Sequence, residues 1–212
     1  MADIIFLSNW RLSFPQLVEP KSSVQPSPAN PNPVKKYSAD FLAPPDNAGV
    51  QEFGKIYAAL AQEKWKEHAP AVMQMIQQDK RQRCFGNGSE KVNQKTFKAY
   101  DGYEGMFYIS ANKDQMPQMI KADGSAVDAT NTMEYQALAR KLYGGCYVNA
   151  AVRPWLQDNK HGRGVRCELI AVQFFADGEP FGEAATDATA MFKPVASVAQ
   201  PAAATGFPSF SG

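Results

Sequence analysis

The first hydrophobic pattern along the chain has a period of two. Residues 3–14, DIIFLSNWRLSF, are rich in aromatic and β-branched side chains, which predicts a long strand. The apolar residues that share one parity are Ile4, Phe6, Trp10, Leu12 and Phe14. We interpret Trp10 on this face as a core residue rather than a ligand contact. Residues 35–44 predict a second strand, which ends at two prolines.

The pattern then changes to a helical one. Residues 48–68 place apolar side chains largely on one stripe, and Asp46 or Asn47 is suited to cap the start of this helix. Trp65 lies on the stripe and is predicted to be core. A shorter helix is predicted over residues 70–79, with a proline in its first turn.

Strand patterns return in the second half of the chain. Residues 105–111, 146–156 and 165–175 predict strands, and residues 133–143 predict a short helix that ends at two glycines. About five to seven strands with helices inserted among the early ones indicate a mostly β domain. We therefore expect a barrel or a strongly curved sheet.

Composition divides the chain near residue 182. Residues 1–182 are predicted to form one domain, with a proline-rich loop at 22–34 and a helical insertion at 46–79. From residue 183 to 212, Ala, Pro, Ser, Thr and Gly dominate. Such a segment buries too little apolar area to offset its ordering entropy, so we expect a disordered tail.

The net charge of +1 hides an uneven distribution. Residues 80–98 hold six Lys or Arg against one acid, and residues 153–166 hold four against one. From Asp177 to the end, four acids face one lysine. Basic segments in a nearly neutral chain suit a polyanionic ligand.

Several classes of function are disfavoured by the sequence. The two histidines are far apart, and the three cysteines are odd in number, with no zinc-site spacing. The acids are scattered, and no phosphate-binding glycine motif is present. We therefore expect no enzyme, no metal and no cofactor. The start lacks a signal-peptide pattern and no run is long enough to cross a membrane, so we expect a cytoplasmic protein without a membrane partner.

The segment 95–110, KTFKAYDGYEGMFYIS, combines aromatic rings with charges. Alternation in its strand places Phe107 and Ile109 on a core face and Tyr108 on the outer face. The strand 146–156 likewise has one apolar face and one mixed aromatic and polar face. Exposed rings that stack on unpaired bases, beside cations that neutralise phosphates, are what single-stranded nucleic acid requires.

This reasoning yields two sets of candidate site residues. The predicted base-stacking residues are Tyr100, Tyr103, Tyr108, Tyr147 and Trp155. The predicted phosphate-binding residues are Lys80, Arg81, Arg83, Lys91, Lys95, Lys98, Arg153, Lys160, Arg163 and Arg166. Packing in the core is the alternative for each ring, and a solvated surface is the alternative for each cation.

Several phrases resemble a family of phage-encoded single-stranded-DNA-binding proteins, related to the replication single-strand binders of short-tailed phages. The phrases are RLSFPQLVEP, KKYSADFLAPP, ISANKDQMPQMI, YGGCYVNAAVRPW and GRGVRCELIAVQFFADGEPFG, in this order. The resemblance spans residues 4–182 and points to an enterobacterial phage. It implies an oligonucleotide-binding (OB) fold, a five-stranded Greek-key barrel, with an added helix. It also implies sequence-independent protection of single strands in replication, recombination or repair.

The chain departs from such proteins at its end, because TGFPSFSG carries no acid after Asp187. Recruitment of replication proteins through the tail is therefore in doubt, and weak binding of double-stranded DNA is a further hypothesis. Two other functions stay open. One is a phage structural or protein-interaction module without DNA binding, and the other is a nuclease or recombination enzyme.

Overall fold

The computed structural model describes residues 3–22, 24–128 and 130–182. They fall in the first of two units, Met1–Gly182 and Glu183–Gly212. The predicted disordered tail lies outside the described residues.

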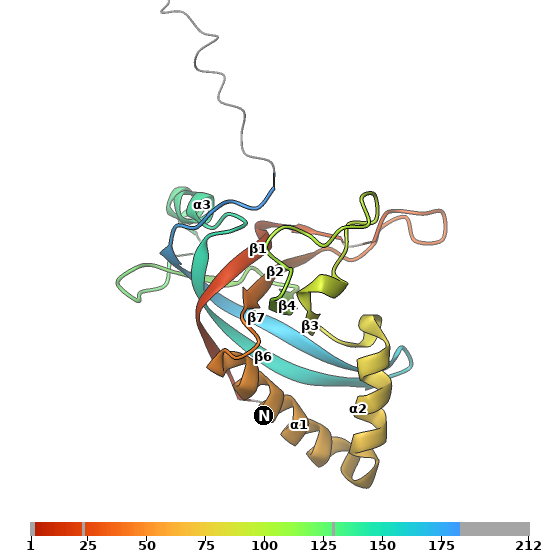
Figure 1. Cartoon of the computed structure of the whole chain (residues 1–212). Coiled ribbons are helices and arrows are strands. Elements are labelled where there is room, and N and C mark those ends of the chain that lie inside the picture. Colours follow the sequence, from red (N-terminus) through yellow and green to blue (C-terminus); the bar gives the residue numbers. More distant parts are fainter. Residues whose placement is uncertain (1–2, 23, 129, 183–212) are drawn as a thin grey trace, which may run out of the picture. The chain divides into compact units, whose positions relative to one another are not determined.

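Five strands close into a barrel (Figure 1). They are β1 (Ile5–Lys21), β2 (Lys36–Ala43), β4 (Phe107–Lys113), β6 (Tyr147–Asn159) and β7 (Gly162–Ala176). Their order around the barrel is β1-β2-β4-β7-β6 and back to β1. Every neighbouring pair is antiparallel except β4 and β7, which are parallel with Asn112 opposite Glu168. The predicted mostly-β OB fold is thereby confirmed.

Two short strands extend the sheet beyond the barrel. β3 (Phe85–Asn87) pairs with β4, and β5 (Gln118–Ile120) pairs with β7. The sequence patterns did not indicate either one, because three residues are too few to show alternation.

The helical insertion follows β2. α1 (Ala48–Trp65) begins at Asn47, whose side chain accepts a hydrogen bond from the Gly49 amide at 2.8 Å. A 3₁₀ turn, η1 (Lys66–His68), leads to α2 (Ala69–Gln78), and a second turn, η2 (Lys80–Gln82), leads to β3. A third turn, η3 (Gly88–Glu90), follows β3, and α3 (Thr132–Lys141) precedes β6. Figure 1 shows α1 and α2 together at one end of the strands and α3 at the opposite end.

The barrel interior is filled by alternate residues of its strands. The apolar face predicted for residues 146–156 is buried, including Cys146, just before β6, and Val148, Ala150 and Val152 on it. Trp10 and Trp65 are both buried, as their patterns predicted.

The single apolar face predicted for residues 3–14 is wrong at several positions. Ile4, Phe6 and Phe14 are exposed, whereas Trp10 is buried. The pairing of β1 shifts register between Leu7 and Trp10 and again after Ser13. Each irregularity adds a residue to the strand and therefore reverses the faces of the side chains beyond it.

Candidate nucleic-acid interface

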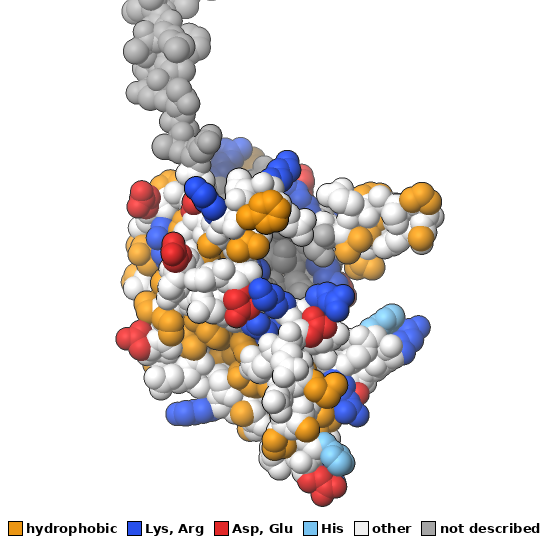
Figure 2. Space-filling model, turned by 45° about the vertical axis from the view of Figure 1, so that its right-hand side comes forward, with side chains coloured by type: hydrophobic (Ala, Val, Ile, Leu, Met, Phe, Trp, Pro, Cys, Tyr) orange, Lys and Arg blue, Asp and Glu red, His pale blue; other side chains and the backbone are white. Residues whose placement is uncertain are grey.

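Two adjoining hollows lie on the outer face of the barrel. The larger, about 630 Å³, lies beneath the loop over residues 22–35. The smaller, about 450 Å³, is lined by Trp155 and by residues at the end of β4. Lys36 and Asn112 line both, so we treat the two as one feature, called the groove. Figure 2 shows the surface hollowed between two projections, the 22–35 loop and the β6–β7 turn.

The position of the groove is the one that an OB fold uses for ligands. In such folds the second and third barrel strands bind oligonucleotides, together with the loops that join strands one and two and strands four and five. The equivalents here are β2, β4, the 22–35 loop and the β6–β7 turn. The groove is formed by several of these elements.

Two aromatic rings in the groove are open to solvent. Trp155 is 44% exposed and lines the smaller hollow. Phe14 is 46% exposed and lines the larger one. Phe14 has a φ of +46°, and its ring meets the Tyr100 ring edge-on, with centroids 4.8 Å apart. Part of the surface of each ring is therefore accessible within the groove.

Three lysines line the groove, namely Lys21, Lys36 and Lys113. Lys36 pairs with Asp114 at 3.3 Å, and Lys113 pairs with Glu168 at 3.2 Å. The register of β2 and β4, with Tyr37 opposite Lys113, places Lys36 near Lys113. The groove thus gathers cations from three different strands.

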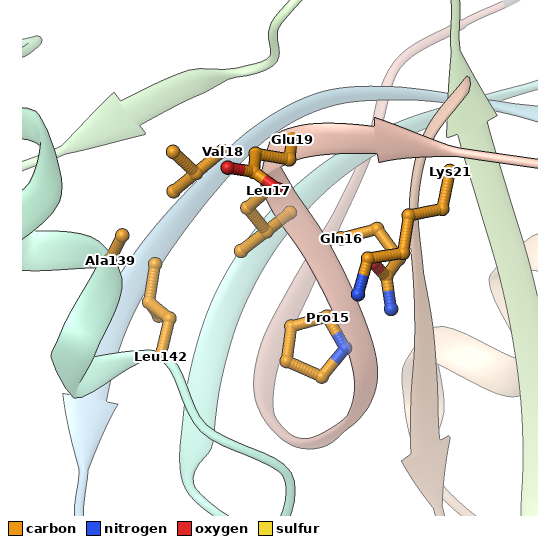
Figure 3. Close-up of a pocket in the computed structure, with 8 residues that line it drawn as sticks. All are labelled: Pro15, Gln16, Leu17, Val18, Glu19, Lys21, Ala139 and Leu142. Atoms are coloured by element: carbon orange, nitrogen blue, oxygen red, sulfur yellow. The ribbon is translucent and has the colours of Figure 1, made fainter. Parts of the chain in front are cut away.

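A third hollow, of about 250 Å³, lies between β1 and the end of α3. Figure 3 shows Gln16 and Lys21 extending to one side of β1, while Ala139 and Leu142 lie on the other. Gln16 and Lys21 also line the larger hollow of the groove. Lys21 therefore extends toward the groove and away from α3.

Comparison with known proteins decides the family. Residues 3–201 match the family model described as the single-stranded-DNA-binding protein of Enterobacter phage Enc34. The chain belongs to this family. A putative protein, p50, of Acyrthosiphon pisum secondary endosymbiont phage 1 is 32% identical over 179 residues, which cover 84% of this chain and 85% of that protein.

Solved structures of the Enc34 family agree with the fold described above. The bacteriophage Enc34 single-stranded-DNA-binding protein in complex with single-stranded DNA is 26% identical, with a TM-score of 0.62. That match covers 84% of this chain and 89% of the other. A second structure of the bacteriophage Enc34 single-stranded-DNA-binding protein is also 26% identical, with a TM-score of 0.60 and 90% coverage of both chains. The resemblance stated from the sequence is therefore confirmed.

The predicted base-stacking residues differ in their exposure. Trp155 is exposed, and Tyr100 and Tyr147 are half-buried. Tyr103 and Tyr108 are buried. The expectation that Tyr108 faces outward into solvent is wrong, and neither buried ring has a free face for a base in this structure.

The segment 88–106 is the physical reason for this burial. It covers the outer face of β2 and β4, where Leu42, Tyr103 and Tyr108 pack into a small second core. The Tyr103 hydroxyl donates a hydrogen bond to Asp40 on β2 at 2.6 Å. Burial, followed by the nearby Asp40 carboxylate, raises the pKa of the Tyr103 phenol well above its ordinary value. Burial also raises the pKa of Tyr108.

Three predicted phosphate-binding residues make contacts that hold parts of the fold together. Arg83 is 7% exposed at its side chain, and its guanidinium binds Glu90 at 2.6 Å. Lys91 forms an ion pair with Asp40 and donates a hydrogen bond to Ser110. Arg166 donates to the Arg81 carbonyl at 2.9 Å, which ties β7 to η2. The basic segments 80–98 and 153–166 therefore contact each other, and some of their cations form this contact.

The remaining predicted cations are on the surface or at the groove margin. Arg153 pairs with Glu168 of the groove at 3.1 Å. Lys80, Arg81 and Arg163 pair with neighbouring acids. Among the predicted phosphate-binding residues, Lys95, Lys98 and Lys160 are exposed and form no ion pair with the described residues.

Reasoning from the sequence missed four residues of the groove, namely Phe14, Lys21, Lys36 and Lys113. Two signals were available. Lys21 and Lys36 flank the proline-rich loop, and this loop joins the first two strands of an OB fold. Lys113 ends its strand on the same side of the barrel.

The described part of the chain holds neither a metal-ligand cluster nor a helix that could span a membrane. Over residues 3–22, 24–128 and 130–182, three or more His, Cys, Asp or Glu side chains nowhere gather as metal ligands would. In the same residues, each helix is too short or too polar to cross a membrane. Cys84, Cys146 and Cys167 are buried free thiols.

Proposed function

We propose that this protein binds single-stranded DNA in the groove without reading its sequence. Bases stack on Trp155 and Phe14, and Lys21, Lys36 and Lys113 lie beside the phosphates. The observation that carries the proposal is the pairing of exposed rings with lysines on the ligand-binding face of an OB barrel. Membership of the Enc34 family supports it. Stacking tolerates every base, so the groove suits strands of any sequence.

The same proposal covers the biological role. Coating of single strands would protect them during phage DNA replication, recombination and repair, in the cytoplasm of an infected bacterium. We expect no catalytic turnover. Recruitment of replication proteins through residues 183–212 stays a prediction, as does weak binding of double-stranded DNA.

The direct test is titration of a fluorescent oligo-dT of about 30 nucleotides at several salt concentrations, with metal ions chelated. We expect log affinity to fall linearly with log salt, because each neutralised phosphate releases counterions. The three groove lysines, with Lys160 and Arg163 at the β6–β7 turn, predict that contacts within the groove contribute a slope between about −2 and −3.5, at roughly −0.7 per phosphate.

The competing functions give different results in this titration. A protein-interaction module predicts no binding at low salt and oligomers that form with concentration. A nuclease predicts shortening of the oligonucleotide when divalent metal is restored. A 30-base-pair duplex used as competitor tests the double-stranded hypothesis, and failure of the duplex to compete at low salt contradicts it.

Glu168 is expected to limit the affinity of the groove. Its carboxylate binds both Lys113 and Arg153, so a phosphate that approaches these cations meets a negative charge. Glu168→Gln removes that charge, and we expect oligo-dT to bind about two- to five-fold more tightly, equivalent to ~0.5–1 kcal/mol for a partly exposed pair. Titration at one low salt concentration measures the change.

The matched control is Glu134→Gln. Glu134 lies on α3, pairs with Lys121 at 3.5 Å and lines neither hollow of the groove. It should leave the affinity unchanged. Weaker binding by Glu168→Gln would mean that the carboxylate positions the groove cations rather than competing with phosphate.

A further inference from the structure

A small hairpin over residues 92–99 projects from the segment that covers β2 and β4. Val92 pairs with Ala99 at its base, and the Asn93 amide donates to the Lys98 carbonyl at 2.8 Å. At the tip, the Phe97 amide donates to the Asn93 carbonyl, and the Asn93 side chain accepts from the Lys95 amide, both at 2.8 Å. These bonds give the tip one defined conformation.

The Phe97 ring at the tip of the hairpin is exposed to solvent. Phe97 is 82% exposed and has a φ of +56°. A bulky residue with positive φ is strained, and an exposed ring gains nothing from packing. Glycine or asparagine would satisfy such a turn at lower cost. Packing therefore does not explain a phenylalanine at this position.

The base of the hairpin is fastened beside the groove at two points. Lys91 binds Asp40 and Ser110, which lie on the outer face of β2 and β4. The Tyr100 ring contacts Phe14, which lines the larger hollow. The Tyr100 amide donates to the Lys91 carbonyl at 3.1 Å and joins the two points. The hairpin thus starts at the margin of the groove.

Two lysines flank the exposed ring. Lys95 and Lys98 are exposed and form no ion pair within the residues that the structure describes. An aromatic face between two free ammonium groups is suited to an unpaired base with its neighbouring phosphates. A protein partner with an apolar site would leave these charges unmatched.

We propose that the 92–99 hairpin is a second contact for single-stranded DNA, which receives the strand where it leaves the groove. Phe97 stacks on a base, and Lys95 and Lys98 contact the adjacent phosphates. The inference rests on the proposed function, because it needs a strand in the groove. It adds to that function a dependence on strand length, since a short oligonucleotide fills the groove without reaching Phe97.

The test compares Phe97→Ala with the unchanged protein across oligo-dT lengths from about 6 to about 30 nucleotides. For the longest strands we expect at least a roughly five-fold loss of affinity, the effect of one stacked base. For the shortest strands that still bind, we expect no change. Phe97→Gly should behave alike while relieving the positive φ, so thermal unfolding of this variant separates lost stacking from lost folding.

The control is Met133→Ala, which removes another apolar side chain that is 84% exposed, on α3. It should bind every length as the unchanged protein does. Equal binding by Phe97→Ala at all lengths, with tight binding by the unchanged protein, would overturn the hairpin contact and leave the groove standing. An equal loss at every length would also overturn it. If the unchanged protein binds no oligo-dT, the result contradicts both the proposed binding in the groove and the hairpin contact that depends on it.

Discussion

Trp155→Ala is expected to weaken the binding of oligo-dT by roughly five- to 150-fold, the loss of one stacked base at about 1–3 kcal/mol. Trp155 is the exposed ring in the smaller hollow, where Lys36 and Lys113 also lie. The loss should occur with short and long strands alike, because the ring lies within the groove. Trp155→Phe keeps a π face and should retain most of the affinity.

Intrinsic fluorescence gives an independent measurement of the same contact. Trp10 and Trp65 are buried, so Trp155 is the accessible member of the three tryptophans. Oligo-dT should quench the fluorescence of the unchanged protein, and Trp155→Phe should abolish most of the quenching while the strand still binds.

Phe175→Ala serves as the matched control for Trp155→Ala. Phe175 is a ring that is 53% exposed on β7 and lines neither hollow of the groove. Its removal should leave the affinity unchanged. Equal effects of the two variants would contradict the placement of the DNA over Trp155.

The second large effect concerns stability. Asp40→Asn should destabilise the protein by about 2–4 kcal/mol, because a partly buried cation and a buried phenol lose their charged partner. Asp40 is 6% exposed, accepts a hydrogen bond from Tyr103 and pairs with Lys91. For a chain of this length, the melting temperature should fall by roughly 4–16 °C. Thermal unfolding monitored by circular dichroism measures the change.

Two further variants bracket this result. Tyr103→Phe removes one hydrogen bond and keeps the ion pair, so a smaller loss of about 1–2 kcal/mol is expected. Asp79→Asn breaks a pair with Arg81, whose side chain is 89% exposed, and should leave the melting temperature almost unchanged, because solvent screens this pair. If Asp40→Asn and Asp79→Asn have the same melting temperature, the pair between Asp40 and Lys91 does not hold segment 88–106 in place.

Local patterns were sufficient where a segment has regular structure. The helix expected over residues 48–68 forms as α1 with Asn47 as its cap, and the two faces expected for residues 146–156 are those of β6. Residues 3–14 followed the pattern less well. A register shift after Leu7 is set by pairing with β6 and leaves no local periodic signal.

The candidate site depended on contacts between distant segments, which a sequence pattern does not contain. Trp155 was predicted because alternation along one strand places it outward. Tyr108 was placed outward by the same rule, but the segment 88–106 folds over it and buries it. Lys36 and Lys113 come together through the pairing of β2 and β4, so neither belongs to a visible basic run.

The parallel pairing of β4 and β7 has a consequence for the mechanical stability of the barrel. It closes the barrel through one paired position, Asn112 with Glu168, and both residues line the groove. A strand of DNA bound as proposed therefore contacts both sides of the joint. Its binding free energy adds to the work needed to open the barrel there, so the protein would be hardest to pull apart while it holds its ligand.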